Sequence, residues 1–272
     1  MTRIGAVEFL NARPLVYGLE QEAWCEVRFD VPSVCARLLH AGDIDLGLVP
    51  AIELLRGPQP YDVAAGPCIG CRGAVASVAL FSRVPVEQVR TIALDTSSRS
   101  SAALLRILCA RHFGIAPAFV DRPPHLAAML EQADAALLIG DPALDAPWQA
   151  LGLDMIDLGQ AWWDMTGLPF VFAVWAGRRG RVAMDVADRL AGVKDAGVAA
   201  IPAIAAAYAD GDVGRQARAQ QYLQQHIRYD LDEEARRGLA TYLDLAVELG
   251  LAPGPATGHS WVGTPPAVSA RA

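Results

Sequence analysis

One short run of residues carries a hydroxyl group on almost every side chain. It lies between the apolar segment 91–95 and a helical pattern that starts at Ala102, and it consists of Thr96, Ser97, Ser98, Arg99, Ser100 and Ser101. One hydroxyl is enough to cap a helix, so five hydroxyls and a guanidinium exceed that need. Helix starts present free N–H groups and a partial positive charge. The run therefore predicts a binding site for an anion such as a carboxylate, with redundant capping as the alternative.

Three more positions stand where a predicted strand ends and a helix begins. In open α/β sheets such junctions line the ligand site. Asn11 follows the first strand, and its amide could orient a substrate hydroxyl or simply cap a helix. Ala51 follows the strand predicted at 45–50. Asp141 follows another predicted strand and could act as a general base, accept a hydrogen bond from a substrate hydroxyl, or open a turn with Pro142.

The five cysteines form no pattern typical of a metal or disulfide framework. Their odd number suits a reducing compartment. Cys68 and Cys71 make a CxxC pair, but no second pair follows, and neither His40 nor His112 stands at a zinc-ligand spacing from them. We expect a loop with two small apolar side chains here, and no metal site.

Apolar segments alternate with helical patterns through the first two thirds of the chain. The predicted strands are RIGAVEFL, VRFDVP, DLGLVP, VASVALFSR, TIALD, AFVD, ADAALLIGD and FVFAVWAG. The alternation implies parallel sheets. Segments 36–55 and 126–144 repeat a helix, an acidic turn, a strand and a proline. Two similar lobes would explain this repeat, and so would the general likeness of any two αβ units. From about Val182 the chain is expected to be helical without a strand, and the tail from Pro253 to be loosely ordered.

The bulk composition is that of a packed globular protein. Of the 272 residues, 53% are hydrophobic and 19% are charged, far from the polar signature of disorder. The net charge of −7 provides no overall positive field for nucleic acid or anionic lipid. Neither an export signal nor a stretch of about 18 apolar residues is visible. We therefore expect a cytoplasmic protein with no nucleic-acid or membrane partner.

Six long strings follow one another over about residues 4 to 180: VEFLNARPL, DLGLVPAIELL, GAVASVALFS, LDTSSRSSAALLRIL, LLIGDPAL and TGLPFVFAVW. In this order they resemble the chorismate dehydratase family of the futalosine route to menaquinone. Phe9 stands where the family pattern has tyrosine, and Ser100 where it has threonine. The second departure keeps a hydroxyl, whereas the first puts a phenol contact in doubt.

The resemblance implies an α/β protein with the two-lobed fold of type II periplasmic binding proteins, in which two crossover strands connect the lobes. We expect the crossings near Val78 and Val174. This gives a discontinuous lobe I of residues 1–82 plus 174–272 and a lobe II of residues 83–173.

The activity implied is conversion of chorismate to 3-[(1-carboxyvinyl)oxy]benzoate with loss of water. It is a hydro-lyase reaction that needs no cofactor or metal. Asn11 and Asp141 would be catalytic. The resemblance adds Ser77 to the substrate-binding residues already predicted, namely Ala51, Thr96, Ser97, Ser98, Arg99, Ser100 and Ser101. The protein is expected to be a monomer or a homodimer with a small-molecule substrate.

The chemistry suits these residue types. Removal of the ring C3 proton builds negative charge that spreads to the ring carboxylate, where fixed donors stabilise it. Loss of the C4 hydroxyl then yields an aromatic ring. We expect Asn11 to orient the leaving hydroxyl or the enolpyruvyl group. The base is either Asp141 or the substrate's own side-chain carboxylate.

Three other functions fit the same fold class. A solute-binding protein for a small carboxylate would require an export signal or lipid anchor. The sister enzyme of the same pathway, which forms a naphthoate, typically opens with a Ser-Pro-Cys-Pro-Asn-like string, and FLNARPL stands here instead. A ligand-sensing effector module would normally follow a DNA-binding helix pair.

Overall fold

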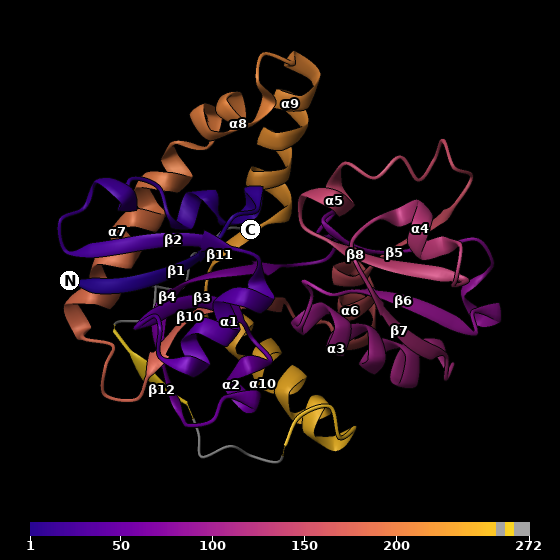
Figure 1. The fold of residues 1–272 in the computed structure, drawn as a ribbon, viewed down its shortest axis with the longest axis horizontal. Coiled ribbons are helices and arrows are strands. Elements are labelled where there is room, and N and C mark those ends of the chain that lie inside the picture. The colour runs from indigo at the N-terminus through magenta and orange to yellow at the C-terminus, as the bar shows by residue number, and fades with distance from the viewer. Residues whose placement is uncertain (254–258, 264–272) are drawn as a thin grey trace.

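The computed structural model describes residues 1–253 and 259–263. Its strands form two sheets that lie side by side, each covered by helices (Figure 1). The first sheet runs in the order β11 (Arg228–Asp230), β4 (Tyr61–Cys71), β10 (Phe170–Arg178), β3 (Leu46–Pro50), β1 (Thr2–Val7) and β2 (Cys25–Asp30), with β12 (Ser260–Val262) also beside β4. The second runs β7 (Ala118–Arg122), β6 (Thr91–Asp95), β8 (Ala135–Ile139), β5 (Val78–Ser82) and β9 (Asp154–Asp157). The expected two-lobed α/β architecture is confirmed.

Helices connect and cover these strands. Around the first sheet lie the 3-10 helices η1 (Leu10–Leu15) and η2 (Leu19–Gln21), with α1 (Pro32–Ala41), α2 (Glu53–Arg56), α7 (Met184–Ala199), α8 (Ile201–Ala209), α9 (Val213–Gln221), η5 (Tyr222–His226) and α10 (Glu233–Glu248). Around the second lie η3 (Val86–Gln88), α3 (Ser100–Leu108), η4 (Cys109–Phe113), α4 (Leu126–Leu130), α5 (Asp141–Leu144) and α6 (Leu158–Thr166). The C-terminal α10 packs on β10 and also contacts α3, so it touches both lobes.

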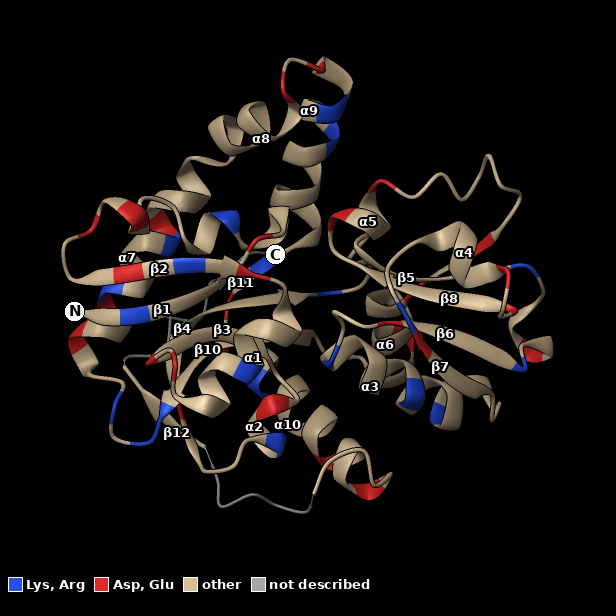
Figure 2. Cartoon of the chain, viewed as in Figure 1, with Lys and Arg blue, Asp and Glu red and all other residues tan. Residues whose placement is uncertain are grey.

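Local sequence explains several element ends. Helix α1 starts with Pro32 and stops at Gly42, which adopts a left-handed conformation with φ of 83°. Asp157 caps α6 by accepting from the Gln160 N–H at 3.0 Å. The central strands β3 and β8 are apolar and buried at every residue, and both appear uncharged in Figure 2. Strands covered on both faces have this continuous apolar pattern.

The sheets are mixed rather than parallel. Strand β1 pairs in parallel with β2 and β3, and β6 with β7 and β8, as the alternation predicts. However, β10 is antiparallel to β3 and β4, and β5 is antiparallel to β8 and β9. These are the strands by which the chain enters one lobe from the other. The strand by which the chain enters a lobe is therefore antiparallel to neighbouring strands that βαβ units place in parallel.

The crossings differ in position from the sequence expectation. All of β5, from Val78 to Ser82, pairs in the second sheet, and all of β10, from Phe170, pairs in the first. The chain therefore passes between the sheets at 72–77 and 167–169 rather than near Val78 and Val174. This pairing favours lobe boundaries in these two segments over the predicted bounds of 1–82 plus 174–272 and 83–173.

Four strands were not anticipated: β4, β9, β11 and β12. Cys68 and Cys71 lie in β4 and not in a loop, and burial raises the pKa of both thiols. Gly66, Pro67 and Gly70 within β4 are residues that usually interrupt a strand, which explains the error. Strand β11 lies in the part of the chain expected to be helical, and β12 lies in the tail expected to be loosely ordered. Residues 254–258 and 264–272 of the predicted loose tail lie outside the described residues.

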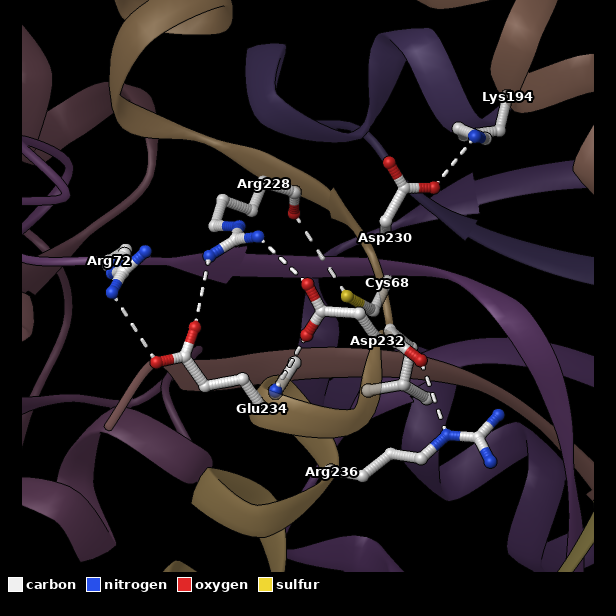
Figure 3. A network of polar contacts seen from close by, with 10 residues as sticks. Cys68, Arg72, Lys194, Arg228, Asp230, Asp232, Glu234 and Arg236 are labelled. Carbon is white, nitrogen blue, oxygen red and sulfur yellow. Dashed lines mark hydrogen bonds and ion pairs between the residues drawn. The ribbon is translucent and has the colours of Figure 1, made fainter. Parts of the chain in front are cut away.

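Charged side chains fasten the C-terminal segment to the first lobe (Figure 3). Arg228 in β11 contacts Asp232 at 2.8 Å and Glu234 at 3.8 Å, and Glu234 also lies 3.5 Å from Arg72. Lys194 of α7 bonds Asp230 at 2.7 Å. Arg72 stands at the start of the first crossing segment, so this network reaches the point where the chain leaves the lobe.

No single described helix is long and apolar enough to cross a membrane. Helices α7 and α8 pass that test only together, by length and composition, and they are bent by 66° at their junction.

Candidate active site

A cavity lies between the two lobes. The space around it, with the open solvent at its mouth included, is about 490 Å³. The lining comes from both sheets, the elements next to them and the first crossing segment: Val7, Phe9, Asn11, Pro32, Pro50, Ile69, Val75, Ser77, Val78, Arg99, Ser100, Ser101, Ile139, Gly140, Phe172 and Ala173. Apolar walls with a few polar groups can hold a ring and fix its orientation.

Asn11 lies on the cavity wall contributed by η1, directly after β1. Its side-chain oxygen is buried and has no hydrogen-bond partner among the described residues. Leaving a buried acceptor unpaired is unfavourable by about 1–3 kcal/mol. An acceptor in this state at a cavity wall is suited to a ligand hydroxyl.

Ser77 ends the first crossing segment and lines the same cavity, with no exposed surface. The Tyr222 hydroxyl donates to the Ser77 oxygen at 2.6 Å. Tyr222 lies in η5, and burial raises the pKa of its phenol, while Ser77 and the nearby Asn11 side chain act against that rise. Tyr222 was not predicted as a site residue, because nothing in the local sequence signals a partner 145 residues away.

The start of α3 faces the cavity with Arg99, Ser100 and Ser101. The first-turn N–H groups of a helix have no partner within the helix. Lobe I holds this helix start in place: the Ile52 N–H donates to the Ser100 hydroxyl at 3.2 Å, and the Tyr242 hydroxyl donates to the Ser100 carbonyl at 3.0 Å.

Buried Glu53 anchors Arg99 from the opposite lobe. One Glu53 carboxylate oxygen lies 3.4 Å from Arg99, and the other lies 3.2 Å from the His40 ring. Burial lowers the pKa of His40, with the Arg99 charge acting in the same direction and Glu53 opposing both. Glu53 was also missed from sequence, where a glutamate in a short helix resembles a surface residue.

The structure separates the rest of the hydroxyl-rich run from this cavity. Ser97 donates to Asp95 at 2.6 Å, and the Ser98 hydroxyl accepts from the Ala102 N–H at 3.2 Å, which is the capping alternative. Thr96 and Ser98 line a second, more polar cavity on the other side of Arg99. That cavity also contains Arg56, Leu94, Asp95, Ala102, Ala103, Arg106 and Asp121. The turn directs Thr96 and Ser98 to this second cavity and Ser97 to Asp95, so within the run only Arg99, Ser100 and Ser101 line the cavity between the lobes.

Ala51 is fully buried and does not line the cavity. Its N–H donates to the Phe172 carbonyl at 2.9 Å, so this junction supplies a sheet contact and not a free donor. Pro50, one residue earlier, is the part of the junction that reaches the cavity.

Asp141 joins the lobes instead of facing the cavity. Its carboxylate accepts from the Leu10 N–H at 3.0 Å, across the interface between α5 and η1. Burial raises the pKa of Asp141, while the Leu10 N–H acts against that rise. Next to it, Gly140 has φ of 63° and ψ of −147°, and a β-carbon there would stand 2.6 Å from the Phe9 ring. Phe9 thus packs directly on the backbone of the other lobe.

The described residues contain no group of three or more His, Cys, Asp or Glu side chains that could hold a metal ion. The cavity itself, as far as the described residues line it, contains one ionisable side chain, Arg99. A largely apolar cavity with one amide, three serine hydroxyls and one guanidinium can bind an anionic ring compound, but its described lining offers no carboxylate, imidazole or amine for proton transfer.

Two lobes that are joined by two crossing segments, with a cavity between them, define the class of periplasmic-binding-protein-like folds. Solved structures agree. A protein from Archaeoglobus fulgidus is similar with a TM-score of 0.73 and 18% identity, covering 92% of this chain and 98% of that one. The periplasmic aliphatic sulphonate binding protein of Escherichia coli has a TM-score of 0.64 at 18% identity, with 94% and 89% coverage. Such identities establish the fold alone.

Sequence comparison identifies the family of the chain. The family model described as menaquinone biosynthesis matches residues 2–248, so the chain belongs to that family. A curated relative from Thermus thermophilus, named chorismate dehydratase, is 30% identical over 270 residues, which is 92% of this chain and 96% of the relative.

Proposed function

We propose that this protein is a chorismate dehydratase that forms 3-[(1-carboxyvinyl)oxy]benzoate in menaquinone biosynthesis. The observation that carries the proposal is the composition of the cavity between the lobes. It combines an anion-binding helix start with an unpaired amide oxygen and a serine hydroxyl, and its described lining has no acid–base side chain. The family membership and the Thermus thermophilus relative support the same reaction.

Chorismate fits the distribution of charge in this cavity. It carries two carboxylates on a small ring, and the start of α3 with Arg99, Ser100 and Ser101 offers donors for one of them. The apolar lining, which includes Ile69, Ile139 and Phe172, suits the ring. A local positive site can bind such a dianion although the whole protein has a net charge of −7.

The reaction follows from what the cavity contains. The enolpyruvyl carboxylate of the substrate removes the C3 proton, since the described lining provides no base. The electrons move through the diene toward the ring carboxylate at the helix start, where fixed donors stabilise the charge. The C4–oxygen bond then breaks, the departing hydroxide takes the proton held by the carboxylate, and water leaves. Asn11 accepts from the C4 hydroxyl, and Ser77 donates to its oxygen.

Turnover of chorismate by the purified protein tests this function. We expect loss of the diene absorbance together with a product lighter by one water, identified by mass as 3-[(1-carboxyvinyl)oxy]benzoate. A stable complex without turnover would favour a solute-binding function, and turnover only of a futalosine-derived substrate would favour the sister enzyme. A cytoplasmic location and a monomeric or dimeric state stay predictions.

Asp141→Asn distinguishes the two candidate bases. The asparagine oxygen can still accept from the Leu10 N–H, so we expect kcat within about threefold of the wild type. Asp141→Ala removes the bond between the lobes, and we expect kcat/KM to fall about tenfold, the equivalent of one hydrogen bond. Steady-state kinetics on chorismate measures both. A decrease of 100-fold or more in Asp141→Asn would instead make Asp141 the base.

A further inference from the structure

A buried phenol stands behind the cavity wall without reaching the cavity. Tyr222 is 2% exposed and is absent from the cavity lining, yet its hydroxyl donates to Ser77, which does line it. Burial raises the pKa of Tyr222, so the phenol keeps its proton over the whole physiological pH range. Tyr222 is therefore a permanent hydrogen-bond donor to the Ser77 oxygen.

This bond decides what the Ser77 hydroxyl can do. A serine hydroxyl has one hydrogen and two lone pairs. One lone pair is occupied by Tyr222, and among the described residues the Ser77 hydroxyl donates to no protein acceptor. Its hydrogen is thus available to the cavity. Without Tyr222 the hydroxyl could rotate, and a ligand oxygen would compete with other orientations.

The backbone that carries Ser77 is held just as firmly. Ala76 has φ of 64°, in the left-handed region that residues other than glycine seldom adopt. The Asp157 carboxylate accepts from the Val75 N–H at 3.0 Å and from the Ala76 N–H at 2.6 Å, which keeps this conformation in place. Strained backbone fixed by its surroundings is a frequent property of functional sites.

We propose that Tyr222 is a positioning residue that fixes the Ser77 hydroxyl as a hydrogen-bond donor to the departing oxygen of the substrate. This inference rests on the proposed dehydration of chorismate and adds to it a residue outside the cavity. Asn11, whose buried side-chain oxygen has no partner among the described residues, accepts from the same substrate hydroxyl.

A double-mutant cycle with Tyr222→Phe and Ser77→Ala tests the coupling. We expect Ser77→Ala to lower kcat about 100-fold, as loss of one transition-state donor does. Tyr222→Phe should lower kcat about tenfold, with KM within about twofold, because the hydroxyl stays but loses its orientation. The double variant should be no slower than Ser77→Ala, since Tyr222 acts only through Ser77.

Tyr229→Phe is the matched control. Its hydroxyl is also buried, in neighbouring β11, but has no hydrogen-bond partner among the described residues. We expect wild-type kcat for Tyr229→Phe, and thermal unfolding of both phenylalanine variants shows that each is folded. An active wild type with an equally active Tyr222→Phe would overturn the inference alone, as would a double variant about 1,000-fold slower than wild type. A wild type without chorismate turnover would overturn the proposed function as well.

Discussion

Asn11→Ala lowers kcat for chorismate about 100-fold while the protein stays folded. The lost amide is the acceptor for the C4 hydroxyl in the proposed reaction, and removal of a single group that acts on the reacting atoms typically lowers kcat by about 10²–10³. The free energy of unfolding, in contrast, should not decrease. The alanine removes a buried oxygen that has no partner among the described residues, so the free energy of unfolding should be unchanged or slightly higher.

Steady-state kinetics and chemical unfolding of the same preparation check this pair of effects. A decrease in activity without a decrease in stability identifies a group kept for function rather than for folding. Full turnover by Asn11→Ala would end its assignment to the leaving group. A large loss of stability would instead make Asn11 a helix-capping residue.

Gly140→Ala should lower kcat/KM about 100-fold by preventing close approach of the lobes. The backbone at Gly140 lies near a region of conformational space that is essentially restricted to glycine, and the new methyl group would stand 2.6 Å from the Phe9 ring. The lobes must separate or Phe9 must move. Either change displaces the helix start at Ser100 from Asn11.

Gly152→Ala separates strain from contact. Gly152 also has φ of 63°, but no described atom lies within 4 Å of its added β-carbon. We expect it to lower the free energy of unfolding by about 1 kcal/mol and to leave kcat/KM unchanged. Adding Phe9→Ala to Gly140→Ala should recover part of the lost activity, as measured by initial rates. No recovery, together with a Gly152→Ala variant as inactive as Gly140→Ala, would rule out the contact explanation.

Sequence patterns predicted the elements whose signals lie within a few neighbouring residues. The strand-to-helix junctions at Asn11, Ser100 and Asp141 all occur where the sequence placed them, because apolar runs, caps and prolines act over a few residues. Strand β4 was missed because its glycines and proline mask a strand that pairing with β10 and β11 stabilises.

The direction of side chains was harder to predict than their position. The run from Thr96 to Ser101 was expected to face one ligand, but the turn before α3 directs Ser97 to Asp95 and Ser98 to its own helix. Likewise, Ala51 and Asp141 stand at predicted junctions and yet make contacts between elements. Backbone geometry at a helix start selects which hydroxyls reach the cavity, and composition does not contain that information.

Residues that contact the site residues from distant parts of the chain could not be predicted from local sequence patterns. Tyr222 meets Ser77, and Glu53 meets Arg99, only after the two lobes and the C-terminal helices have assembled. The internal similarity of segments 36–55 and 126–144 corresponds to a shared position at the cavity. In both, a buried strand ends at the cavity, at Pro50 and Ile139, and a short helix follows.

A crystal structure of the Asn11→Ala variant soaked with chorismate tests the central claim most directly, because slow turnover should leave the substrate in place. We expect electron density for the ring between the lobes, one carboxylate at the N–H groups of Ser100 and Ser101, and the C4 oxygen within hydrogen-bonding distance of Ser77. Chorismate bound in the second cavity beside Arg56 and Arg106, with the cavity at Ser77 empty, would contradict the account.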